Sequence, residues 1–168
     1  LVWFRRDLRV LDQPAFHAAA KSGAPVIAVF IKDDLVNKLG AAPKWRLGKA
    51  LEVFERTLAD LNVQLVLRSG PALEVLQNLI KETNAQGVYW SRLYDPQSVA
   101  RDTNVKASLR AGGVEARSFG GHLMFEPWSV ETKMGGMYKV FTPFWRSVKD
   151  RDVEVPLPVP SKITVANK

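Results

Sequence analysis

The chain has 168 residues and a formal net charge of +7, and 46% of its residues are hydrophobic and 24% charged. This length and composition predict one compact domain with a substantial core, and they exclude a low-complexity chain. Cysteine is absent, which excludes disulfides and thiolate metal sites, and no apolar run approaches the ~20 residues that span a bilayer.

Five short apolar runs along the chain are typical of buried strands. They lie at residues 2–4, 26–31, 63–67, 88–90 and 114–117. The second run, VIAVFI, is apolar at every position, and this pattern favours a strand that is covered on both faces. The runs therefore predict a sheet in the interior of the domain.

Helical patterns alternate with these strands. The expected helices lie at about residues 14–21, 43–61, 71–83 and 96–111. The second of them has an apolar stripe at three- and four-residue spacing, formed by Leu47, Leu51, Phe54, Leu58 and Leu61. Strands and helices in alternation predict an α/β fold, a Rossmann-like doubly wound sheet of five parallel strands with helices on both faces.

The composition changes along the chain and divides it into three parts. Residues 1–125 form the expected α/β core, and residues 126–152 form a segment rich in aromatic and basic side chains. Residues 153–168 carry several prolines and are expected to be an extended linker between domains. Because strand-like sequence begins at residue 1, we expect the chain to be a piece of a longer protein.

Common catalytic signatures are missing from the sequence. It contains no glycine-rich phosphate loop, no zinc-binding HExxH and no GxSxG, and its two histidines, His17 and His122, are far apart. A self-contained enzyme is therefore disfavoured, and we expect no catalytic residues and no metal site.

A binding crevice has better support than a catalytic site. The first strand runs directly into Arg5-Arg6-Asp7-Leu8-Arg9, at the sheet edge where open α/β folds hold ligands. Small residues opposite Trp45 could admit a planar ligand whose polar edge meets arginine and carboxylate groups. The alternative is that these charges only form ion pairs that fix the turn.

Four motifs, in order, resemble the DNA photolyase and cryptochrome family. They are LVWFRRDLRVLDQPAF at residues 1–16, GAAPKWRLGKAL at 40–51, ARD at 100–102 and YKVFTPFWR at 138–146. The resemblance covers essentially the whole chain and is greatest for bacterial cyclobutane pyrimidine dimer photolyases. It implies the amino-terminal α/β domain, which in this family carries a light-harvesting antenna pigment.

The resemblance also implies a pigment site and a cofactor outside this chain. The residues carried over to the pigment site are Arg6, Phe30, Ile31, Ala41, Trp45 and Asp95. Flavin adenine dinucleotide (FAD) would bind a helical domain that follows the chain. Leu39, Trp45, Leu93 and the Gln97-Ser98 pair depart from the known antenna subtypes, so folate, deazaflavin and flavin mononucleotide all stay open.

The aromatic and basic segment has two interpretations that can both hold. Its aromatic residues could pack against the helical domain, while Lys139, Arg146, Lys149 and Arg151 could form a basic rim that attracts damaged DNA. The resemblance implies light-driven DNA repair by the whole protein, and the alternative is a cryptochrome that signals without repair. We expect a cytoplasmic monomer that does not bind membranes.

Overall fold

The computed structural model describes residues 1–165 and has a five-stranded parallel sheet at its centre. The strands are β1 (Val2–Phe4), β2 (Ala28–Lys32), β3 (Leu65–Ser69), β4 (Gly87–Ser91) and β5 (Glu115–Phe119). Their order across the sheet is β3-β2-β1-β4-β5. The predicted doubly wound fold is therefore confirmed, and the strand order reverses direction between β1 and β4.

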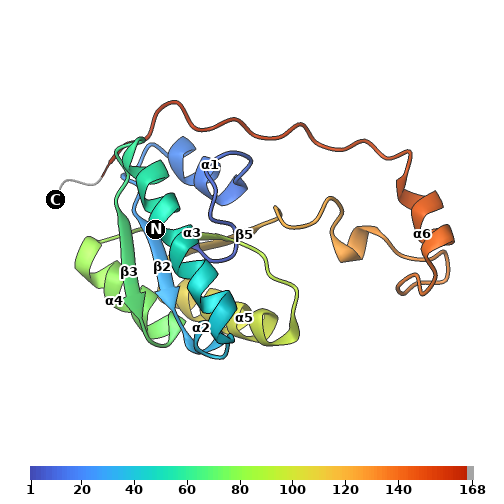
Figure 1. Ribbon diagram of the computed structural model, residues 1–168, viewed down its shortest axis with the longest axis horizontal. Coiled ribbons are helices and arrows are strands. Elements are labelled where there is room, and N and C mark those ends of the chain that lie inside the picture. Colours follow the sequence, from blue (N-terminus) through green and yellow to red (C-terminus); the bar gives the residue numbers. More distant parts are fainter. Residues whose placement is uncertain (166–168) are drawn as a thin grey trace.

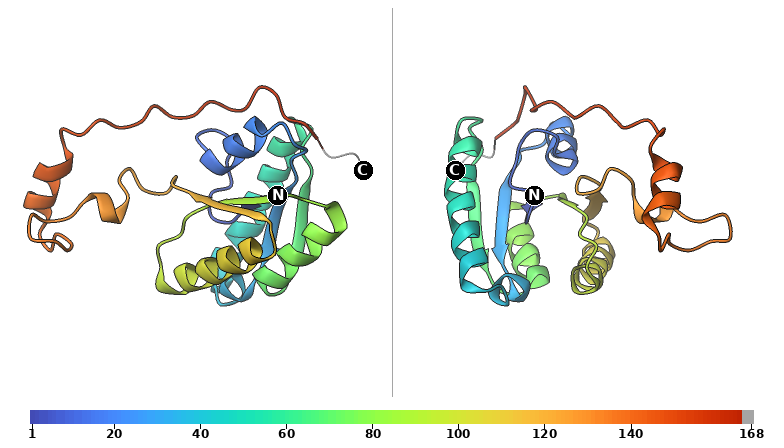
Figure 2. Two further views of the ribbon diagram at one scale, coloured as in Figure 1. Left: turned by 180° about the vertical axis from the view of Figure 1, so that it is seen from behind. Right: turned by 45° about the vertical axis from the view of Figure 1, so that its right-hand side comes forward.

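Helices cover both faces of the sheet (Figures 1 and 2). The structure contains α1 (Pro14–Lys21), α2 (Asp34–Asn37), α3 (Ala41–Ala59), α4 (Ala72–Thr83), α5 (Pro96–Ala111), the 3-10 turn η1 (Pro127–Ser129) and α6 (Phe141–Val148). Helices α1 and α3 pack on one face, and α4 and α5 pack on the other. The sheet is thus the middle of three layers.

The alternation of side chains along the strands explains these layers. In β1, Trp3 joins the core beneath α4 and α5, whereas Val2 and Phe4 join the core beneath α1 and α3. All three side chains are fully buried. A strand that is buried on both faces needs apolar residues at every position, and this accounts for the continuous apolar runs in the sequence.

Several element boundaries differ from the predictions. Strand β2 begins at Ala28 rather than at Val26, because the backbone of Val26 pairs instead with Val165 near the end of the described chain. Helices α2 and α6 and the turn η1 were not predicted. The predicted bounds of β1, α1 and α5 match the structure.

The chain beyond β5 leaves the body of the domain and then returns to it (Figures 1 and 2). We call residues 120–152 the arm; it carries η1 and ends in α6. We call residues 153–165 the strap; it runs back along the domain, where Ile163 packs on the core and Pro160 is buried. The proposed roles of the arm and the strap as interdomain segments stay predictions, and residues 166–168 of the predicted linker lie outside the described residues.

Candidate ligand-binding site

A cavity of about 520 Å³ opens at the carboxyl ends of the central strands. The residues that line it are Arg5, Arg6, Leu8, Phe30, Ile31, Asp33, Leu35, Val36, Leu39, Pro43, Arg46, Leu47, Ala50, Leu93, Ser98 and Arg101. They come from β2, α2, α3 and α5, from the turns that follow β1 and β4, and from the segments that flank α2. This is the edge of the sheet where doubly wound folds bind their ligands.

The turn after β1 is fixed by its own charged side chains. The Asp7 carboxylate accepts hydrogen bonds from the Arg5 backbone N–H at 3.1 Å and from Gln13 Nε2 at 2.6 Å. Arg9 donates to the carbonyl oxygen of Asp12 and, at 2.7 Å, to that of Gly121. Asp7 and Arg9 therefore fix the turn, but through hydrogen bonds to backbone and amide groups rather than through the ion pairs that the sequence suggested.

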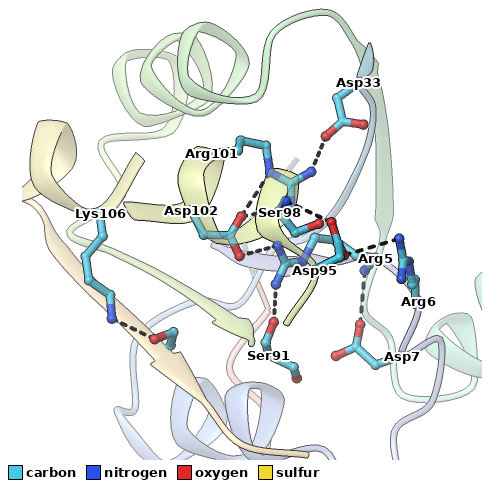
Figure 3. A network of polar contacts seen from close by, with 11 residues as sticks. Arg5, Arg6, Asp7, Asp33, Ser91, Asp95, Ser98, Arg101, Asp102 and Lys106 are labelled. Atoms are coloured by element: carbon cyan, nitrogen blue, oxygen red, sulfur yellow. Dashed lines mark hydrogen bonds and ion pairs between the residues drawn. The ribbon is translucent and has the colours of Figure 1, made fainter. Parts of the chain in front are cut away.

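Below the cavity lies a buried network of charges (Figure 3). Arg5 pairs with Asp102 at 2.6 Å and also donates to the carbonyl oxygen of Ser91. Arg101 bridges the carboxylates of Asp33 at 2.5 Å and Asp102 at 2.8 Å. This network joins the turn after β1, the start of α2 and α5 at the cavity floor.

Both guanidinium groups of the network also lie over Trp3. The Arg5 and Arg101 guanidinium carbons are 4.6 Å and 4.8 Å from the indole centroid. Burial lowers the pKa of Arg5, while the nearby Asp102 carboxylate opposes this shift. Arg5 is thus a cation held by a carboxylate and an aromatic face, with little freedom to contact a ligand.

Arg6 differs from Arg5 because it points to solvent at the rim of the cavity (Figure 3). It lies 3.6 Å from Asp95, and its side chain is 63% exposed. Although burial acts to raise the pKa of Asp95, hydrogen bonds from Ser98 and the charge of Arg6 outweigh it and lower the pKa. Arg6 is the arginine of the turn that is free to meet a ligand.

Six side chains were predicted from the family resemblance to contact a pigment. The structure places four of them in or beside the cavity and two outside it. Arg6, Phe30 and Ile31 line the cavity, and Asp95 sits beside it as the partner of Arg6. Ala41 and Trp45 lie on the exposed first turns of α3, outside the lining, and the Trp45 side chain is 70% exposed. The pigment contacts of all six stay predictions.

Sequence reasoning missed much of the lining that α3 supplies. Pro43, Arg46, Leu47 and Ala50 follow one face of α3 at helical spacing and form one wall. Arg46 brings a second cation to this wall without a carboxylate partner among residues 1–165. The apolar stripe that contains Leu47 was visible in the sequence, but its extension toward a cavity was not.

The predicted basic rim lies on and near α6. Lys139 and Arg146 are exposed, Lys149 pairs with Asp150 at 3.0 Å, and Arg151 stacks on Phe125 at 5.2 Å. The same helix exposes two aromatic rings, Phe141 and Trp145, which stack with their centroids 6.2 Å apart. Both predicted roles, DNA attraction and packing, are compatible with this exposure.

Residues 1–165 contain neither a helix that could span a membrane nor a group of metal-binding side chains. Within residues 1–165 no helix is long and apolar enough to cross a membrane. No group of three or more histidine, cysteine, aspartate or glutamate side chains in that range could hold a metal ion.

Fold and site together define a class: a doubly wound α/β domain with a ligand-sized cavity at its topological switch point, walled by apolar side chains and edged by arginines. Within that class, the family model for DNA photolyase matches residues 1–161. The chain belongs to the DNA photolyase family, as its sequence motifs predicted.

Individual relatives agree with this assignment. A deoxyribodipyrimidine photo-lyase of Agrobacterium fabrum is 44% identical over 90% of this chain, which spans 32% of that protein. Cryptochrome-1 of Arabidopsis thaliana is 37% identical over 97% of the chain, which spans 25% of it. The crystal structure of a bacterial class III photolyase from Agrobacterium tumefaciens is 42% identical, with a TM-score of 0.95 over 99% of this chain and 35% of its own. The chain thus spans about a third or less of these relatives.

Proposed function

We propose that this chain is the amino-terminal domain of a deoxyribodipyrimidine photolyase and that its cavity holds a light-harvesting pigment. One observation carries the proposal: in a member of the DNA photolyase family, a cavity of about 520 Å³ opens at the topological switch point. Doubly wound folds bind planar ligands at this place.

The side chains around the cavity fit an aromatic pigment with an acidic tail. Leu35, Leu39 and Leu47 offer an apolar wall on which a ring system can pack. Arg6 and Arg46 supply cations at its edge. Ser98, also in the lining, lies beside the Asp95 carboxylate and lowers its pKa by hydrogen bonding.

Each group of residues has a distinct task in this proposal. The pigment, when bound, absorbs light and passes its excitation energy to the flavin of the whole protein. The apolar wall orients the ring and excludes water, and Arg6 and Arg46 hold its acidic tail by charge-assisted hydrogen bonds. The buried network of Arg5, Asp102 and Arg101 keeps the cavity floor in place. Whether the pigment is a folate, a deazaflavin or flavin mononucleotide is left to the experiment.

The reaction itself belongs to the whole protein in this proposal. FAD and the damaged DNA would bind a helical domain outside this chain, in keeping with relatives about three times as long. The exposed aromatic side chains of α6, Phe141, Phe144 and Trp145, would pack on that domain, and Lys139, Arg146, Lys149 and Arg151 would attract DNA. The chain by itself would neither bind FAD nor repair dimers.

A second candidate function is light signalling without repair. It is favoured by the 37% identity to Arabidopsis Cryptochrome-1 over nearly the whole chain. Repair is preferred because the bacterial photolyase is more similar, at 44% identity.

A repair assay on the full-length protein separates the two functions. DNA with defined cyclobutane pyrimidine dimers is incubated with the protein in blue light and in darkness, and the dimers that survive are counted. Loss of dimers only in the light is expected. If dimers persist in the light although the protein contains reduced flavin, repair is refuted and signalling takes its place.

Pigment binding is tested by filling the cavity. Ala50→Phe places a ring in the lining, whereas Ala42→Phe adds the same ring on the same helix outside the lining. We expect the first variant to lose the pigment absorption of the full-length protein and the second to retain it, with melting temperature as the folding control. Equal pigment content in both variants, each loaded with folate, deazaflavin and flavin mononucleotide in turn, would place the pigment elsewhere.

A further inference from the structure

A second cavity, of about 420 Å³, lies along the other side of α5. Helix α5 lines it with residues at three- and four-residue spacing, Val99, Asp102, Thr103, Lys106, Ala107 and Arg110. Trp90 and Ser118 contribute from β4 and β5, and Trp128 contributes from η1 of the arm. The two cavities share only Leu93, so this one is separate from the proposed pigment site.

The charges around this cavity do not balance. The Asp102 carboxylate is already engaged by Arg5 and Arg101, and Arg92 is neutralised by Glu126 at 2.7 Å. In residues 1–165, no carboxylate forms an ion pair with Lys106 or Arg110. Two cations thus face the cavity without a counter-charge.

Lys106 and Arg110 each have hydrogen-bond donors that no acceptor in residues 1–165 occupies. Lys106 Nζ uses one donor on the Ser118 hydroxyl at 2.6 Å, and Arg110 uses its Nε on the Ala116 carbonyl oxygen at 3.1 Å. A lysine ammonium has three donors and an arginine five. Burial, followed by the nearby charges of Arg110 and Arg92, lowers the pKa of Lys106. An anion in the cavity would relieve this repulsion.

Aromatic groups complete the cavity. Trp128 is 61% exposed at the rim, and the Arg92 guanidinium lies 5.4 Å from its centroid. Trp90 is fully buried, and its indole N–H has no hydrogen-bond partner within the described chain. An indole ring at the rim is a stacking platform for a planar group.

From these contacts we propose that the second cavity binds a nucleotide: a planar base that stacks on Trp128 and a phosphate between Lys106 and Arg110. A free mononucleotide and one nucleotide of single-stranded DNA share this chemistry, so both are used as probes.

The experiment measures the affinity of the full-length protein for AMP, adenosine, inorganic phosphate and a thymidine oligonucleotide by calorimetry. The cationic pair is removed in the double variant Lys106→Gln, Arg110→Gln, and the platform is removed in Trp128→Ala. The matched control is Lys21→Gln, Lys81→Gln, which removes the same charge from the last turns of α1 and α4. Melting temperatures check folding.

We expect AMP or the oligonucleotide to bind wild type at least tenfold more tightly than adenosine or phosphate alone, because ring and phosphate both contribute. The double variant and Trp128→Ala should each weaken this binding by about tenfold, and the control should change it less than about twofold. The proposal is overturned if neither nucleotide probe binds at millimolar concentration. It is equally overturned if folded variants bind as wild type does, or if phosphate alone binds as tightly as AMP.

Discussion

Arg5 is a buried cation in the middle of the domain, with only 7% of its side chain exposed. Burying a charge is costly unless a partner of opposite charge accompanies it. Asp102 provides that charge at 2.6 Å, and the Trp3 ring adds a cation–π contact. The second residue of the arginine pair in FRRDLR, Arg6, has the opposite surroundings, with 63% of its side chain exposed.

Replacement of Asp102 by Ala should therefore destabilise the domain severely. The variant leaves Arg5 buried without its partner, and losses of about 3–5 kcal/mol are typical of such a change. The measurement is the free energy of unfolding in urea. Glu82→Ala, which breaks the exposed Arg68–Glu82 pair, is the control and should cost about 1 kcal/mol or less. Equal losses in the two variants would contradict the role given to the buried pair.

The environment of the Tyr89 hydroxyl leads us to expect that the domain loses stability at high pH. Burial, together with the hydrogen bond that its hydroxyl donates to Glu115 at 2.5 Å, raises the pKa of Tyr89 to about 12. Because this pKa exceeds the ordinary value of about 10, the folded state retains a proton that the unfolded state releases. The resulting stability is fully present below pH 10 and is lost between about pH 10 and 12.

Unfolding free energies of wild type and Tyr89→Phe across this range test the prediction. The wild-type advantage should shrink by up to about 1.4 kcal/mol per pH unit above pH 10, since Phe does not titrate. Parallel pH profiles for the two proteins would show that Tyr89 is not responsible.

At the scale of elements, the sequence predicted those helix boundaries that are marked by local signals such as capping residues and glycine. Helix α5 begins at the Asp95 cap and ends before Gly113, whose φ of 78° is the left-handed conformation that glycine favours. Helix α2 was missed because it has only four residues and no apolar stripe, although Asp33 caps it. Helix α6 was missed although Phe141, Phe144, Trp145 and Val148 recur at helical spacing, because it has only eight residues and contains Pro143, which disfavours a helix interior.

The rotation of α3 about its own axis decides which of its side chains face the cavity, and this explains why some site residues could be predicted and others could not. Phe30 and Ile31 end β2, and the ends of parallel strands meet at one edge of the sheet whatever the details. On a helix, neighbouring residues point in directions about 100° apart, so Arg46 lines the cavity while Trp45 faces solvent. The exact rotation of α3 depends on its tertiary contacts with the sheet, which cannot be predicted from the sequence pattern alone.

The Asp95 side chain has two roles, as the cap of α5 and as a charge at the cavity rim, and substitutions can distinguish their contributions to stability. Its Oδ1 accepts a hydrogen bond from the Ser98 backbone N–H at 2.9 Å, while its Oδ2 lies 3.6 Å from Arg6. Asp95→Ala removes both and should cost roughly 0.5–2 kcal/mol of unfolding free energy, whereas Asp95→Asn keeps a good cap and should cost much less. If Asn costs as much as Ala, the charge rather than the cap stabilises the helix.

At the scale of the whole molecule, the arm and the strap are both tied to the same short part of the body. Near the start of the arm, the Gly121 carbonyl oxygen accepts a hydrogen bond from Arg9. The strap is held at Leu157, which exchanges two hydrogen bonds with Asp12. Both anchors therefore lie in the turn between β1 and α1. The sequence did not indicate this return, because an extended proline-rich segment has no periodic pattern that marks its packing partner.

Hydrogen exchange can test the anchor of the strap. The Leu157 N–H donates to the Asp12 carboxylate at 3.1 Å, and Asp12 has a φ of 49°. Asp12→Gly removes the acceptor while tolerating this backbone conformation. We expect exchange of the Leu157 amide to accelerate about tenfold or more, with little change at Val26, whose amide donates to Thr164. An unchanged rate at Leu157 would mean that the strap is held by other contacts.

The turn between β1 and α1 also carries Arg6, and this links places that are far apart in the fold. Residues 122–156 form a long excursion whose two ends are tied to one short stretch of backbone. A displacement of α6 would therefore reach that stretch as well as β5, from which the arm continues. The same stretch carries the Arg6 guanidinium at the rim of the cavity.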